Sequence, residues 1–186
     1  MTGMVIHFNG YAGVGKLTTA RALCARLNGR LIDNHSIINA ARVPWEHGTR
    51  EYLDLLNRLR AEIYIDLAKQ SPDEVQVFTN YMAAELAEDV QTVQDVNDLA
   101  KRRGVPFVPV LLECDKAVNL ERMQSPDRAL KEKLRRPEVM EEHMAKYTIY
   151  HPEEEPYALR VDVTHGTPDQ SVDVIVGHLK AKGLLP

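Results

Sequence analysis

The sequence is poor in features that mark several functional classes. It has two cysteines and one tryptophan among 186 residues, and 23 basic residues are outnumbered by 27 acidic ones, which gives a net charge of −4. The two cysteines have no metal-ligand spacing, so they favour reduced thiols in a cytoplasmic protein over a disulfide framework or a zinc site. Without a surplus of Lys and Arg, nucleic-acid binding is not expected.

Long apolar runs are missing as well. The apolar stretch at residues 4–8 is far too short for a secretion signal or a membrane span, so we expect no membrane association. Hydrophobic residues make up 44% and charged residues 27%, which is typical of a globular protein with a buried core. The length predicts a single domain over residues 1–186 and leaves the oligomeric state open.

Strand-like and helix-like segments alternate along the chain. Short apolar runs predict strands at 4–9, 30–33, 75–79, 106–114 and 158–163. Helical spacing predicts helices at 16–28, 50–69, 83–103 and 167–182, the third of them with its apolar side from Leu86 to Ala100 facing inward. Strands separated by helices predict an α/β fold of three layers, a five-stranded parallel sheet with helices on both faces.

A glycine-rich loop, GYAGVGKLTTA at residues 10–20, joins the first strand to the first helix. Glycines permit the dihedrals that turn successive N–H groups inward, and the positive end of a helix then favours an anion. A lysine at the end of such a loop reaches the outer phosphates of a nucleotide. We therefore predict a phosphate-binding loop; the alternative is a turn with a surface lysine. The predicted nucleotide-binding residues are Gly10, Gly13, Val14, Gly15, Lys16, Leu17 and Thr18.

Leu17 stands where the usual loop has the Ser or Thr that holds magnesium. We expect Leu17 to pack on the apolar side of the first helix, with Ala20 and Cys24 at positions i+3 and i+7. The hydroxyl role then falls to Thr18, one position further along, rather than to Thr19.

The motif Gly15-Lys16-Leu17-Thr18 is similar to the G-K-G-T of adenylate kinases and shikimate-kinase-like proteins, which are small kinases of the P-loop NTPase superfamily. The resemblance covers most of the chain in element order, but only the phosphate loop is specific. It implies the strand order 2-3-1-4-5, ATP as the phosphoryl donor, and Mg²⁺ held largely by water. Thr18 and Asp33 are the residues it places nearest the metal.

Asp33 ends the second predicted strand, at the sheet edge where ligands of open α/β folds bind. Shikimate-kinase-like proteins carry D-x-D here, whereas this chain has Asp33-Asn34-His35. Thr79 stands where adenylate kinases have a magnesium-shell Asp, and no glycine triplet follows it. The His in place of the second Asp and the missing glycine triplet argue against shikimate as the substrate. Asp33 is the predicted general base or magnesium-shell residue, with His35 second.

The acceptor-binding region is expected at about residues 34–70. Three side chains there are candidate contacts, namely Tyr52, Arg58 and Arg60. Core packing would explain Tyr52 equally well.

Residues 121–155 are polar, rich in charge and too long for a connecting loop. They predict either a helical lid or an ordinary solvated helix pair. The resemblance implies a lid whose arginines cover the nucleotide and the transferring group, since guanidinium groups suit phosphate oxygens. Arg122 is the predicted nucleotide contact and Arg128 a predicted catalytic residue, and Arg135 and Arg136 are further candidates. Pairing with neighbouring carboxylates is the alternative for each.

These residues together predict an ATP-dependent phosphotransferase. Its catalytic residues would be Lys16, Asp33 and Arg128, its cofactor Mg²⁺ and its acceptor a small metabolite or nucleotide of unknown identity. The alternatives are a nucleotide-binding switch or plain NTPase without an acceptor, and a family member that binds nucleotide without turnover.

Overall fold

The computed structural model describes residues 3–124 and 136–186. A five-stranded sheet forms its centre, and all four neighbouring strand pairs are parallel. The strand order is β2-β3-β1-β4-β5, as the resemblance implied. The strands are β1 Met4–Asn9, β2 Arg30–Asp33, β3 Val75–Thr79, β4 Phe107–Glu113 and β5 Leu159–Asp162.

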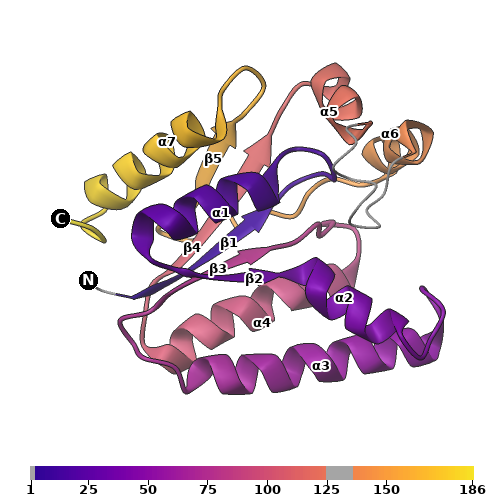
Figure 1. Ribbon diagram of the computed structural model, residues 1–186, viewed down its shortest axis with the longest axis horizontal. Coiled ribbons are helices and arrows are strands. Elements are labelled where there is room, and N and C mark those ends of the chain that lie inside the picture. The colour runs from indigo at the N-terminus through magenta and orange to yellow at the C-terminus, as the bar shows by residue number, and fades with distance from the viewer. Residues whose placement is uncertain (1–2, 125–135) are drawn as a thin grey trace.

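Helices cover both faces of this sheet (Figure 1). α1 and α7 lie on one face, and α3 and α4 lie on the other, with α2 beside α3. The predicted three-layer α/β fold is therefore confirmed. The helices of the described residues are α1 Lys16–Leu27, α2 Asn34–Arg42, α3 Arg50–Ala68, α4 Ala87–Arg103, α5 Lys116–Met123, α6 Pro137–Lys146 and α7 Pro168–Ala181.

The central strand β1 is buried along its whole length, because helices cover both faces of the sheet there. Its side chains alternate between two cores. Ile6 faces α1 and α7 and joins a cluster with Leu23 and Ile175. Val5 faces the other side and joins a cluster with Val96. Burial on both faces fixes the position of the phosphate loop, since this loop continues directly from β1.

The structure differs from the predicted helices in one boundary and in one additional helix. α4 begins at Ala87 rather than at residue 83, and Leu86 precedes it with 42% of its surface exposed. The residues before it run extended beside the segment after α6, where Ala84 N–H donates to the Thr148 carbonyl over 2.8 Å. The prediction also missed α2, which begins directly after β2 with Asp33 as its N-cap.

α5 and α6 lie beyond the carboxyl ends of the strands, above the phosphate loop (Figure 1). A salt bridge between Lys116 and Glu141 joins them. In the described part of the chain, no helix has the length and apolar character to cross a membrane.

Candidate active site

The loop between β1 and α1 has the backbone that the glycines predict. Gly10, Gly13 and Gly15 have φ values of 150°, 96° and 105°, in the region that side chains disfavour. A Cβ at Gly13 would also lie 2.6 Å from Cγ of Met123 in α5. Nothing lies within 4 Å of a Cβ at Gly15. The loop is therefore packed against α5 on one side and open on the other.

Asn9 fixes the start of this loop. Its buried side chain accepts hydrogen bonds from the backbone N–H groups of Gly10 and Met82. It also donates to the carbonyls of Met82 and Tyr150. All of its usual hydrogen-bonding capacity is used, so Asn9 ties the loop to the ends of β3 and of the segment after α6.

Lys16 is the first residue of α1 and lies at the open side of the loop. Its Nζ donates to the carbonyls of Gly10 over 2.6 Å and of Tyr11 over 2.8 Å. The ammonium group is thus held across the loop, at the positive end of the α1 dipole. An anion that enters the loop meets this charge together with the loop's N–H groups.

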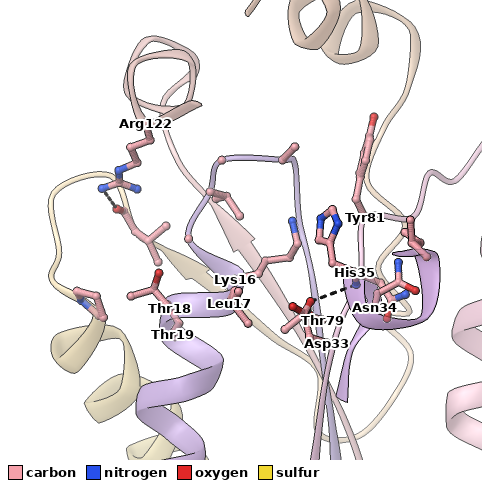
Figure 2. Close-up of a pocket in the computed structure, with 18 of the residues that line it drawn as sticks. Lys16, Leu17, Thr18, Thr19, Asp33, Asn34, His35, Thr79, Tyr81 and Arg122 are labelled. Atoms are coloured by element: carbon pink, nitrogen blue, oxygen red, sulfur yellow. Dashed lines mark hydrogen bonds between the residues drawn. The ribbon is translucent and has the colours of Figure 1, made fainter. Parts of the chain in front are cut away.

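A cavity of about 840 Å³ opens above the loop at the carboxyl ends of the strands. At one end it is lined by Arg122, Pro168 and Ser171. At the other end it is lined by one side of α2, by His47 and by Tyr81; Figure 2 shows Asn34, His35 and Tyr81 at this end. Lys16 lies between these ends, so the cavity extends well beyond the phosphate loop on both sides.

Asp33 lies on the cavity wall, where β2 ends and α2 begins. Its Oδ1 accepts hydrogen bonds from Thr79 Oγ1 over 3.1 Å and from His35 N–H over 3.3 Å. No donor among the described residues binds the other oxygen, Oδ2. The carboxylate is therefore held through one oxygen and offers the second to a ligand. Thr79 stands where adenylate kinases have a magnesium-shell Asp, and in this structure it positions Asp33.

Leu17, Thr18 and Thr19 all line the cavity. Thr18 is exposed, whereas Thr19 is only 3% exposed. Leu17 is half-buried and stands apart from the core cluster that contains Ala20 and Cys24, so the predicted packing with them is wrong. The reason is that the first turn of α1 forms part of the cavity wall, so Leu17 lines the cavity.

Arg122 lies on the opposite side of the cavity from Asp33 (Figure 2). Its guanidinium donates to the carbonyls of Val163 and Thr164, in the loop after β5. Arg136 is exposed at the start of α6. Arg128 and Arg135 lie outside the described residues.

Part of the cavity wall comes from an aromatic cluster that joins three segments. Tyr81 OH and His143 Nδ1 lie 3.1 Å apart, and Tyr11 OH donates to the Tyr147 carbonyl over 2.6 Å. Tyr81 follows β3, His143 belongs to α6, and Tyr11 belongs to the phosphate loop. No local sequence pattern indicates this cluster, because residues 11, 81 and 143 meet only through the fold.

The candidate contacts of the acceptor region have different positions. Tyr52 is buried in the packing between α2 and α3, and Arg58 is exposed. Arg60 donates to Asn34 Oδ1 over 3.0 Å and to Thr92 Oγ1 over 3.3 Å. Arg42 and His47, which were not predicted from the sequence, also line the cavity on this side. The unpredicted helix α2 brings Arg42 to the wall, since it presents His35, Ile38 and Arg42 at helical spacing.

Comparisons with known proteins identify the fold. No protein-family model matches the chain, and no curated protein matches it. Among solved structures, a putative kinase from Chloroflexus aurantiacus has a TM-score of 0.67 at 18% identity, and 97% of each chain is covered. A gluconokinase from Sinorhizobium meliloti has a TM-score of 0.63 at 16% identity, with 97% of this chain and 93% of that chain covered.

A shikimate kinase from Acinetobacter baumannii, solved with shikimate, has a TM-score of 0.63 at 18% identity, with 99% of this chain and 97% of that chain covered. Each likeness extends over nearly the whole chain at low identity. The chain therefore has the fold of the small P-loop kinases.

Proposed function

We propose that this protein transfers the γ-phosphoryl group of ATP to a hydroxyl or phosphate group of a small molecule. The observation that carries the proposal is the position of Asp33. Asp33 lines the same cavity as the phosphate loop and Lys16, and its Oδ2 lacks a donor among the described residues. A phosphoryl donor and a candidate base would thus share one cavity, as phosphoryl transfer requires.

The nucleotide half of the proposed site is the loop from Gly10 to Thr18. Its N–H groups and the Lys16 ammonium would bind the phosphates, which carry the charge that the loop and the α1 dipole favour. Arg122, held by two carbonyls at the far end of the cavity, would contact the base side of the nucleotide. Thr18, exposed to the cavity, would supply the hydroxyl that Leu17 lacks.

Asp33 would accept the proton of the acceptor hydroxyl or hold the magnesium shell. Mg²⁺ takes oxygen ligands and commonly uses one or two carboxylates together with substrate phosphates. The Asp33 carboxylate fits that pattern. In residues 3–124 and 136–186, no group of three His, Cys, Asp or Glu side chains could hold a metal by itself. When bound, Mg²⁺ would neutralise charge on the phosphates.

We further propose that residues of about 121–155 act as a lid and that about 34–70 bind the acceptor. Val139 and His143 of α6 line the cavity from above, which supports the lid. Excluding water protects the phosphoryl group from hydrolysis. Arg128, assigned to catalysis by resemblance, belongs to this lid. An ATP-dependent reaction of this kind also fits the cytoplasm.

A switch or plain NTPase needs no room for an acceptor. Here the cavity continues past Lys16 and Asp33 to Arg42 and His47, a length of wall that ATP alone does not explain. That continuation favours the kinase over the hydrolase.

The test is ADP release measured with Mg-ATP, alone and with a panel of hydroxylated and phosphorylated metabolites. We expect one chemical class of metabolite to raise turnover well above the background rate and to yield a phosphorylated product by mass spectrometry. ATP hydrolysis that is unchanged across the panel would overturn the kinase proposal and favour the NTPase.

A further inference from the structure

The residue that follows β3 lies between the phosphate loop and Asp33 along the edge of the sheet. β3 is placed between β1, which leads into the loop, and β2, which ends at Asp33. Asn80 comes directly after β3 and stays paired with β1, since its N–H donates to the Phe8 carbonyl over 2.9 Å. Asn80 therefore lines the cavity between the group that would hold the ATP phosphates and the proposed base.

The Asn80 side chain is enclosed, yet its two N–H groups are unused. The residue is 4% exposed, and its Oδ1 lies 3.0 Å from Nε2 of His7, a 1% exposed residue of β1. An amide oxygen only accepts, so Nε2 carries the proton and donates. Within residues 3–124 and 136–186, Nδ2 has no acceptor, and it is not one of the sealed polar atoms of that region, so solvent reaches it. Enclosed amides usually have partners, so this donor is available to a ligand.

His7 holds the amide in this orientation. Its ring stacks on Phe107 in the core, with the ring centroids 6.3 Å apart. Burial lowers the pKa of His7 to about 4, so the imidazole is neutral near pH 7 and has a single N–H, the one at Nε2. Turning the Asn80 amide over would bring two N–H groups together. His7 thereby keeps a hydrogen-bond donor, and not an acceptor, toward the cavity.

A neighbouring asparagine shows what a purely structural amide looks like in this fold. Asn9, at the end of β1, uses its side chain on the backbone groups of Gly10, Met82 and Tyr150 and has no capacity left. Asn80 bonds through its side chain to one imidazole and no backbone group of the described residues. The two asparagines follow adjacent strands, so Asn9 fixes the backbone and Asn80 presents a donor.

From this arrangement we propose that Asn80 is a catalytic residue that donates from Nδ2 to an oxygen of the transferring phosphoryl group, and that His7 is a positioning residue that acts through Asn80. This inference deepens the proposed kinase function and rests on it. A fixed donor aimed at the phosphoryl oxygens stabilises their charge during transfer. Because the amide is neutral, it does this without neutralising Asp33, which has to accept a proton.

Nucleotide affinity tests the contact without an acceptor. Calorimetry in the presence of Mg²⁺ compares ADP with a non-hydrolysable ATP analogue, since only the analogue has a γ-phosphate. Asn80→Ala should weaken binding of the analogue by about tenfold and leave ADP within about twofold, because a hydrogen bond to a charged group is lost. Asn57→Ala, an exposed asparagine on α3, is the matched control and should change neither affinity.

Two substitutions of His7 test positioning. His7→Phe keeps a ring to stack on Phe107 and removes the donor, whereas His7→Gln keeps a side-chain N–H for Asn80 Oδ1. His7→Phe should show the same selective loss of analogue affinity as Asn80→Ala, and His7→Gln should recover most of it. Thermal unfolding shows whether each variant is folded. Asn80→Ala changes the cavity wall and decides the contact even if His7→Phe does not fold.

A structural role would give a different result. Loss of the native loop geometry weakens ADP and the analogue alike, so an equal loss for both in Asn80→Ala, or no loss for either, would overturn the inference. Wild-type affinities in a folded His7→Phe protein would remove the positioning role.

Turnover separates this inference from the proposed function. With an acceptor found in the metabolite panel, kcat of Asn80→Ala should fall by about a hundredfold while KM for the acceptor changes little. An unchanged kcat would remove the catalytic role of Asn80 and leave the kinase standing. A selective loss of analogue affinity, together with a panel that stimulates nothing, would remove the kinase and leave the γ-phosphate contact.

Discussion

The two ends of the cavity are built in different ways. At the phosphate end the wall is a glycine-rich turn and the first turn of α1, and both cations are tied to carbonyls, Lys16 to the loop and Arg122 to residues 163 and 164. At the acceptor end the groups are side chains on α2, and Arg42 has no such tie among the described residues.

The difference follows from what each end has to bind. Phosphate groups are common to all nucleotides, so backbone donors on a rigid loop suffice. An acceptor must be told from its many relatives, and that takes particular side chains. If the phosphate end supplies binding and the acceptor end supplies selectivity, substitutions at the two ends should have separable effects on ATP affinity and on phosphoryl transfer.

Lys16→Ala removes the ammonium group at the centre of the phosphate end. We expect turnover to fall by roughly a hundredfold to a thousandfold and ATP affinity to drop, because no other lysine within residues 3–124 and 136–186 lines the cavity. Turnover, calorimetry with ATP and thermal unfolding are the measurements. Unfolding should stay cooperative, and Lys180→Ala, on the exposed face of α7, should change none of these. Wild-type ATP affinity in Lys16→Ala would contradict the phosphate loop itself.

Asp33→Asn tests the boundary between the two ends. Asn keeps an Oδ1 for Thr79 and His35 and is a good N-cap, so the fold and ATP binding should change little, ATP affinity by less than about tenfold. Phosphoryl transfer should fall by about a hundredfold or more, since the negative charge and the base are gone. Asp54→Asn, on the exposed side of α3, is the control. Transfer that survives in Asp33→Asn would move the base elsewhere.

His7 lies in the sheet beneath the phosphate end and should make the stability of the protein depend on pH. It is 1% exposed and bonded to Asn80, and burial lowers its pKa to about 4. Between that value and 6.5 the unfolded chain binds the proton and the native protein does not, so stability falls as the pH drops. The free energy of unfolding should fall by about 2 kcal/mol from pH 7.5 to pH 5 on account of His7.

Denaturant unfolding at a series of pH values measures this loss. His7→Gln should show a shallower fall over the same range, whereas the exposed His165→Gln should follow the wild type. A His7→Gln protein whose stability falls as steeply as that of the wild type would show that His7 does not cause the loss.

The sequence predicts the phosphate end of the cavity more completely than the acceptor end. The phosphate loop is one continuous stretch, so three glycines, a lysine and the flanking strand and helix identify it together. Asp33 could be predicted because the end of a parallel strand fixes its place at the sheet edge.

The acceptor end could not be predicted in the same way. Arg42 reaches the cavity because Asp33 starts a helix there, and the nine residues of α2 are fewer than helical spacing needs to identify a helix by itself. Tyr81 and His143 meet through tertiary packing between β3 and α6, which no local pattern encodes. The predicted packing of Leu17 is wrong for a related reason. Helical spacing shows which side of α1 a residue is on, but it does not show where along α1 the sheet ends.

Leu17→Ser gives the smallest expected effect and tests the phosphate end at its one unusual position. Leu17 is half-buried on the cavity wall and outside the core, so its replacement should lower the free energy of unfolding by about 1 kcal/mol or less. Leu23→Ala, six residues further along α1 and fully buried, should cost about 2–5 kcal/mol and is the control. Turnover should not improve at low Mg²⁺, because Thr18 supplies the hydroxyl. A Leu17→Ser protein that turns over faster at low Mg²⁺ would show that the loop lacks a metal ligand, and the assignment of Thr18 would fall.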